Sequence, residues 1–175
     1  MVPFRETDEA RWLPPIDGRR RLHVIGDATS CGRVALEWAA DLAVRSGVEV
    51  HLVTYHRLRW HAASLPPAAV ARLVCDHELR ALAAAEEVLG PLGVRWQFTS
   101  AAWGALREAV PAAGGLLVLP RHRRSCADRA GALQTLPHPR RVAAALPAHL
   151  VVTVGHGPAR ARPRSMPGRL LPLPH

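Results

Sequence analysis

The sequence predicts an α/β protein in which helices cover both faces of a five-stranded parallel sheet, a three-layer sandwich. The first observation behind this is an alternation of short apolar segments, rich in β-branched residues, with longer segments whose apolar residues recur at helical spacing. The second is composition: 49% apolar and 21% charged residues are typical of a globular chain. Strands joined through helices run parallel. At 175 residues, one domain is expected.

Five short segments predict the strands of this sheet. Each is dominated by Val, Ile, Leu or aromatic residues and is bounded by glycine, proline or polar residues. Apolar side chains at nearly every position of a segment indicate a strand buried on both faces, as parallel sheets require. The predicted strands are Arg21–Asp27, Val48–Tyr55, Val94–Thr99, Leu116–Leu119 and His149–Val154.

Four segments between these strands predict helices. Thr29 or Ser30 can cap the first helix, and Gly47 ends it. Pro66-Pro67 opens the second, because proline suits a first turn, where its missing N–H is not needed. The second helix is expected to run to Gly90, and the other two are expected at 105–113 and 140–146.

The two ends of the chain are expected to lie outside the folded domain, which we place at 21–154. Residues 1–20 are polar and contain prolines, which predicts a flexible N-terminal arm. Residues 155–175 are rich in Arg and Pro, which predicts a disordered tail. The N-terminus does not have the pattern of a signal peptide, and no apolar run approaches the ~20 residues of a membrane span. A cytoplasmic protein is therefore expected.

The formal charge of +9 comes entirely from arginine, since the chain contains no lysine. It is concentrated in two places. Residues 120–141 hold six arginines against one acid, and residues 155–175 hold four arginines and no acid. Such clusters fit association with nucleic acid or another polyanion. Because the tail has no aromatic side chain to stack on bases, we keep this only as the weakest of three functional readings.

Patterns that indicate catalysis or metal binding are missing from the sequence. There is no HExxH or Cys₂His₂ spacing, and three scattered cysteines make neither a metal clip nor a disulfide framework. No nucleophile elbow, Walker A motif or GxGxxG follows a predicted strand. The acidic residues are scattered rather than convergent. We therefore expect neither an enzyme nor a metal site.

Four segments together resemble the universal stress protein family. They are VIGDATS at 24–30, ALEWAADLA at 35–43, EVHLV at 49–53 and HLVV at 149–152. Their order and spacing look like that family's opening strand–helix unit, its second strand and its closing strand. The resemblance implies an adenine-nucleotide-hydrolase-like fold with strand order 3-2-1-4-5, and a homodimer. The closing strand, an apolar edge that would otherwise be exposed, adds to the expectation of a dimer.

Many members of this family bind ATP, and the resemblance assigns two residues to the nucleoside. Asp27 matches the acid that ends the first strand. Tyr55 falls about where the family has its adenine-facing residue, and its ring could stack on a base. The alternative for Asp27 is purely structural, since an aspartate at this place also caps the turn.

The family's glycine-rich phosphate segment, expected after the fourth strand, is not matched. Pro120 and Arg123 stand where its first two glycines would be, and Thr135 is the one hydroxyl that remains near its end. Glycines let backbone N–H groups wrap a phosphate, whereas proline has no N–H. Arg121 and Arg123 could instead bind an anion at the carboxyl end of the strand.

We therefore interpret the chain as a non-enzymatic stress-response or regulatory protein with a degenerate nucleotide site, acting as a dimer and needing no cofactor. The second reading is an ATP-binding protein. In it, Asp27 and Tyr55 hold the nucleoside, and Arg121, Arg123 and Thr135 hold the phosphates. In neither reading does the protein contact a membrane.

Overall fold

The computed structural model describes residues 21–59, 63–110, 115–121, 133–134, 139–146, 149–155 and 160–162. Five strands form the parallel sheet, and each overlaps one that the sequence predicts. They are β1 (Leu22–Gly26), β2 (Val50–Leu58), β3 (Trp96–Ala102), β4 (Gly115–Pro120) and β6 (His149–Val154). They lie in the order β3-β2-β1-β4-β6, which is the order 3-2-1-4-5 of the five parallel strands along the chain. The predicted fold class and strand order are confirmed.

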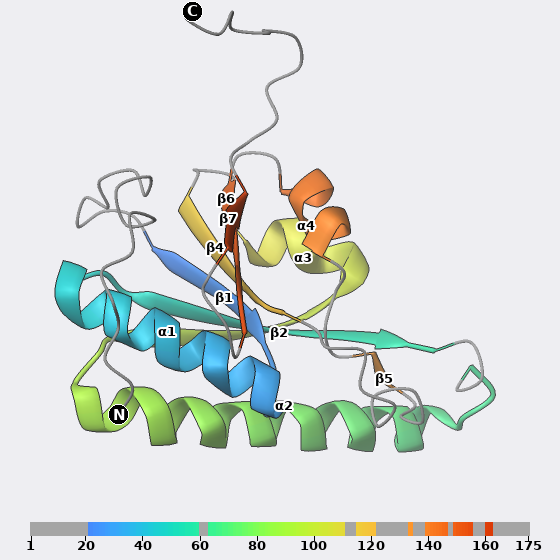
Figure 1. Ribbon diagram of the computed structural model, residues 1–175. Helices are drawn as coiled ribbons and strands as arrows, with labels where there is room; N and C mark the ends of the chain where they lie inside the picture. The colour runs from blue at the N-terminus through green and yellow to red at the C-terminus, as the bar shows by residue number, and fades with distance from the viewer. Residues whose placement is uncertain are drawn as a thin grey trace, which may run out of the picture.

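Among the described residues, four α-helices and two 3₁₀ turns lie between the strands. The α-helices are α1 (Ser30–Ser46), α2 (Pro67–Leu89), α3 (Leu106–Ala109) and α4 (Pro139–Ala145), and the 3₁₀ turns are η3 (Gly90–Leu92) and η4 (Trp103–Ala105). Figure 1 shows α1 and α2 on one side of the sheet and α3 and α4 on the other. The sheet is therefore covered on both faces, as its apolar strands require.

Each face of the sheet has its own hydrophobic core. One core packs alternate residues of the strands, such as Val24 and Leu52, against small residues of α1 and against α2. The other packs the intervening residues, such as Ile25 and Val53, against α3 and α4. β1 is buried along its whole length because it has a strand on each side and helices on both faces.

Local signals in the sequence set the ends of α1 as expected. Thr29 is the N-cap, and its side-chain oxygen accepts a hydrogen bond from the backbone N–H of Gly32. At the other end Gly47 adopts a left-handed conformation, with φ of 67°, and its N–H bonds to the carbonyl of Ala43. The second helix starts at Pro67, as the proline pair predicts.

The third helix is shorter than the sequence predicts. The apolar spacing predicted a helix over 105–113, but α3 ends at Ala109, and Val110 is extended with φ of −112° and ψ of 104°. The reason is Pro111, since a proline disfavours helical geometry in the residue before it. Residues 111–113 of the predicted helix lie outside the described residues.

Two short strands lie where the sequence predicts none. β5 (Leu133–Gln134) pairs antiparallel with Leu58 and Arg57 at the far end of β2. β7 (Arg160–Arg162) pairs antiparallel with β6. The expectation of disorder is wrong for this part of the tail, because the three residues of β7 pair with the backbone of β6. β7 also corrects the premise that β6 has an exposed edge. The remaining tail residues from 156 onward, and the arm at 1–20, lie outside the described residues.

Candidate functional site

The carboxyl ends of β1 and β4 lie side by side at the centre of the sheet. The chain leaves β1 through α1 toward β2, and it reaches β4 only after completing β2 and β3, so the strand order reverses between β1 and β4. Open α/β sheets bind ligands at such a switch point. Asp27 directly follows β1 and Arg121 directly follows β4. The pairing of β1 with β4 ends at Val24 and Val118, three residues before Asp27 and three before Arg121.

Asp27 is buried, with 6% of its surface exposed, and its carboxylate is hydrogen-bonded within its own turn. One oxygen accepts from both the backbone N–H and the hydroxyl of Thr29. Thr29 in turn caps Gly32 of α1. Asp27 therefore stabilises the β1–α1 turn, the structural alternative considered from the sequence.

Gly32 fixes how closely α1 approaches Asp27. A Cβ atom at position 32 would lie 2.2 Å from the backbone oxygen of Asp27 and 2.6 Å from its Oδ1. No side chain fits this space. The aspartate is thus enclosed by the first turn of α1, and glycine is required for the enclosure.

Tyr55 lies in the core on the α3 side of the sheet and is 2% exposed. Its ring meets that of Trp103 edge to face, with centroids 5.8 Å apart and an interplanar angle of 89°. Burial raises the pKa of the phenol, and the nearby guanidinium groups of Arg57 and Arg141 act in the opposite direction. The ring is therefore packed against protein instead of standing open at the end of β2.

Arg121 is the one candidate phosphate ligand whose placement is described. Its side chain is exposed, and its backbone N–H donates to the carbonyl of Val154 at the end of β6. A Cβ on Gly155 would approach the Cβ of Arg121 to 3.0 Å, so Gly155 leaves room for this side chain. Arg121 is held at the switch point and faces solvent.

Arg123 and Thr135 lie outside the described residues. Thr135 nevertheless directly follows β5, whose Gln134 pairs with Arg57 of β2. After β4, the chain therefore pairs through β5 with the carboxyl end of β2. In the sheet, β2 and β4 lie on opposite sides of β1. Of the five sequence-predicted site residues, the structure brings three to adjacent strands. Asp27 directly follows β1 and Arg121 directly follows β4, whereas Tyr55 lies within β2, which continues to Leu58.

A buried polar group near Asp27 was not identified as functional from the sequence. His77 of α2 is 5% exposed, and its Nε2 atom has no hydrogen-bond partner among the described residues. Burial lowers the pKa of His77, and Asp27 acts in the opposite direction, while His56 and Arg80 add to the lowering. In the sequence, His77 lies between Val74 and Ala81 at helical spacing, on the apolar side of this helix, and the structure buries it. A histidine among apolar residues at helical spacing is the sequence signal that could have indicated this buried polar group.

A second buried polar group crosses β1, β2 and β3 on the opposite face. The Nδ1 atoms of His23 and His51 are 3.0 Å apart, and the Nε2 atom of His51 is 2.8 Å from the hydroxyl of Thr99. One Nδ1 must carry a proton and donate to the other. Burial, followed by the charge of Arg21, lowers the pKa of His51, whereas Glu49 acts in the opposite direction. These strand histidines did not stand out in the sequence.

In the ranges that the structure describes, no three His, Cys, Asp or Glu residues are grouped so that they could hold a metal ion. None of the described helices is long and apolar enough to cross a membrane. No family model matches the chain, and no curated protein matches it.

Proposed function

We propose that this protein is a non-enzymatic regulatory or stress-response protein whose nucleotide site is degenerate, and that it acts as a dimer. The observation that supports this most directly is the state of Asp27. Asp27 is 6% exposed, and its carboxylate accepts hydrogen bonds from Thr29 and is enclosed by α1 at Gly32. A carboxylate that receives a ribose or a base would need a free lone pair directed outward from the turn.

The state of Tyr55 supports the same proposal. An aromatic ring that stacks on adenine needs an accessible face. Tyr55 is 2% exposed, and its ring packs against Trp103 inside the core on the α3 and α4 side of the sheet. Adenine binding would therefore require this core to open.

The end of β4 adds a third argument. Pro120 is buried and offers no backbone N–H, and the N–H of Arg121 is used by Val154 of β6. The two backbone positions that begin a phosphate-binding loop are thus unable to donate to a ligand. What remains is the exposed guanidinium of Arg121, which favours the second reading, an anion site built from side chains.

Calorimetric titration of the purified chain with Mg²⁺-ATP separates these two functions. The degenerate-site proposal predicts no saturable heat at millimolar nucleotide. A saturable signal that Asp27→Asn and Arg121→Ala both abolish would overturn it in favour of ATP binding. The matched control is Arg45→Ala, which removes an exposed arginine from the far end of α1. ATP hydrolysis measured in the same samples tests the non-enzymatic part.

A further inference from the structure

The two outer edges of the sheet differ in how well they are protected. On one side the last parallel strand, β6, is covered by β7, a three-residue strand with two arginines. Short edge strands that carry charges resist pairing with another chain. On the other side the sheet ends at β3, and no strand lies beyond it in the part of the chain that the structure describes.

The β3 edge offers backbone groups for pairing. The N–H of Val50 in β2 donates to the carbonyl of Arg95, the residue before β3. The odd-numbered residues of β3 therefore direct their backbone N–H and C=O groups toward β2. Parallel strands alternate in this respect. The N–H and C=O groups of the even-numbered residues therefore point away from the sheet, at Trp96, Phe98, Ser100 and Ala102.

The β3 edge also lacks the features that block pairing. Its seven residues, WQFTSAA, include no charged residue and no proline. Most of its side chains are partly exposed, whereas those of β1 are wholly buried. On a chain with a net charge of +9, a neutral edge is a place where two copies can meet without bringing arginines together.

We infer that β3 is the edge through which two copies of this chain pair, antiparallel and about a two-fold axis, to form one continuous sheet. With the axis at Thr99, Phe98 lies opposite Ser100 of the second copy, and Trp96 lies opposite Ala102 of the second copy. Each large ring then faces a small residue, and the outward backbone groups of both strands bond to each other. A two-fold axis makes the same surface serve both copies.

This inference rests on the self-association included in the proposed function and assigns it to one edge. The dimer interface is thereby assigned to β3 and not to the closing strand. The sequence favoured the closing strand, but β7 covers its outer edge. The assignment to β3 does not depend on whether the protein binds a nucleotide, because β3 lies two strands away from β1 at the sheet edge.

The test is the oligomeric state of the full chain, measured by sedimentation over a range of micromolar concentrations. The first variant, Gln97→Arg/Ala102→Arg, places charges at two exposed positions of β3. The matched control, Ala71→Arg/Ala83→Arg, places the same charges at exposed positions of α2. We expect the wild type and the control to be dimers and the β3 variant to have a dimer Kd raised by about tenfold or more.

A second variant, Ser100→Pro, removes an outward N–H while leaving the ladder to β2 intact, and it should also weaken the dimer. Circular dichroism and thermal unfolding show whether each variant is folded. A wild-type dimer that both β3 variants retain would overturn the assignment to β3 and leave self-association standing. A wild type that is monomeric throughout would overturn self-association itself, and the ATP titration would still decide the nucleotide site.

Discussion

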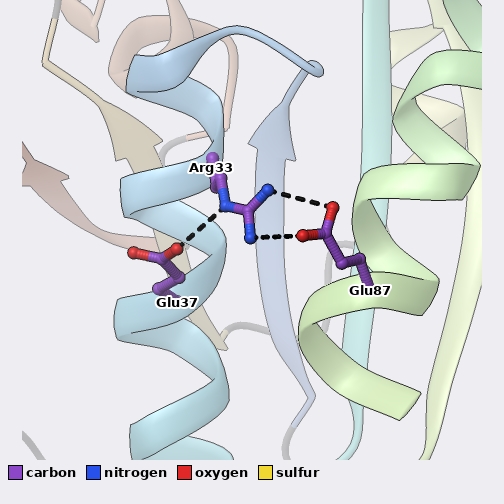
Figure 2. A network of polar contacts seen from close by, with 3 residues as sticks. All are labelled: Arg33, Glu37 and Glu87. Carbon is purple, nitrogen blue, oxygen red and sulfur yellow. Dashed lines mark hydrogen bonds and ion pairs between the residues drawn. The ribbon is translucent and has the colours of Figure 1, made fainter. Parts of the chain in front are cut away.

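Arg33 of α1 and Glu87 of α2 form a two-bond ion pair that joins the first two helices on one face of the sheet (Figure 2). Nη1 of Arg33 is 3.0 Å from Oε2 of Glu87, and Nη2 is 2.7 Å from Oε1. The Nε atom donates to Glu37, one turn further along α1. Each of the three guanidinium nitrogens thus donates to a carboxylate, an arrangement that suits the planar arginine fork.

We expect this ion pair to contribute little to stability because it is exposed. Glu87→Gln should lower the melting temperature slightly, and the difference should shrink at about 1 M salt, where exposed charges are screened. Arg33 lowers the pKa of Glu87 below its ordinary value of 4.5, so the contribution is present above that value and is lost as the pH falls through the lower, folded pKa. The control is Glu108→Gln, at an exposed position of α3. Equal losses in both variants, at either salt concentration, would contradict the prediction.

A larger effect is expected at Gly32, where α1 touches the β1–α1 turn. Gly32→Ala would place a Cβ 2.2 Å from the backbone oxygen of Asp27, and neither backbone can move freely. We expect a loss of about 1–3 kcal/mol or more in the free energy of unfolding, as for overpacked cores. The matched control is Gly26→Ala, whose Cβ would have no neighbour closer than 3.8 Å. Urea unfolding measures both, and similar losses for the two would show that close approach is not the cause.

The sequence predicted those parts of the fold that depend on neighbouring residues. β-branched runs marked the five parallel strands, and Thr29, Gly47 and Pro67 marked helix ends because their side chains or backbone angles act locally. β5 and β7 were missed because two or three residues carry no periodicity. Such short strands exist only where a distant edge, that of β2 or β6, supplies backbone partners.

The candidate site was predictable by position but not by environment. The sequence placed Asp27 and Tyr55 at the ends of adjacent strands. The structure agrees for Asp27, which directly follows β1, but β2 continues past Tyr55 to Leu58. Their burial depends on Gly32 and Trp103, which reach them from a helix and a turn elsewhere in the chain. Whether a polar side chain is open to a ligand is a property of such non-local packing.

Two threonine hydroxyls on neighbouring strands offer a comparison of hydrogen-bonded and unbonded groups. Thr54 of β2 is fully buried, and its hydroxyl has no partner among the described residues. The hydroxyl of Thr99 in β3 lies 2.8 Å from His51. Thr54→Val should be neutral or stabilising, whereas Thr99→Val should cost about 1 kcal/mol, because only the second change breaks a hydrogen bond. Urea unfolding of both variants checks this, and a larger loss for Thr54→Val would mean that its hydroxyl is bonded in solution.

Two buried histidines predict that stability falls in mild acid. The folded-state pKa values of His51 and His77 lie below the ordinary 6.5, mainly through burial. The unfolded chain therefore binds these protons first as the pH falls. Stability is full above about 6.5 and decreases from there toward the folded pKa values. Urea unfolding at several pH values measures the slope, and His51→Leu and His77→Leu should each reduce it. A slope unchanged in both variants would assign the acid sensitivity to other groups.

Removing the tail should change how the protein assembles, because β7 covers the outer edge of β6. A chain that ends at Gly155 lacks β7 and exposes the backbone groups of β6, a strand with the apolar sequence HLVVTV. The described residues place no strand beyond β3 either, so the truncated chain then has two edges for pairing. Two such edges on one molecule permit chains of subunits instead of closed dimers. We expect light scattering to show species larger than dimers for the truncated chain and none for the full chain. Arg160→Ala/Arg162→Ala, which keeps the strand but not its charges, should give a smaller increase. A truncated chain with the same mass distribution as the full chain would show that β7 does not protect this edge.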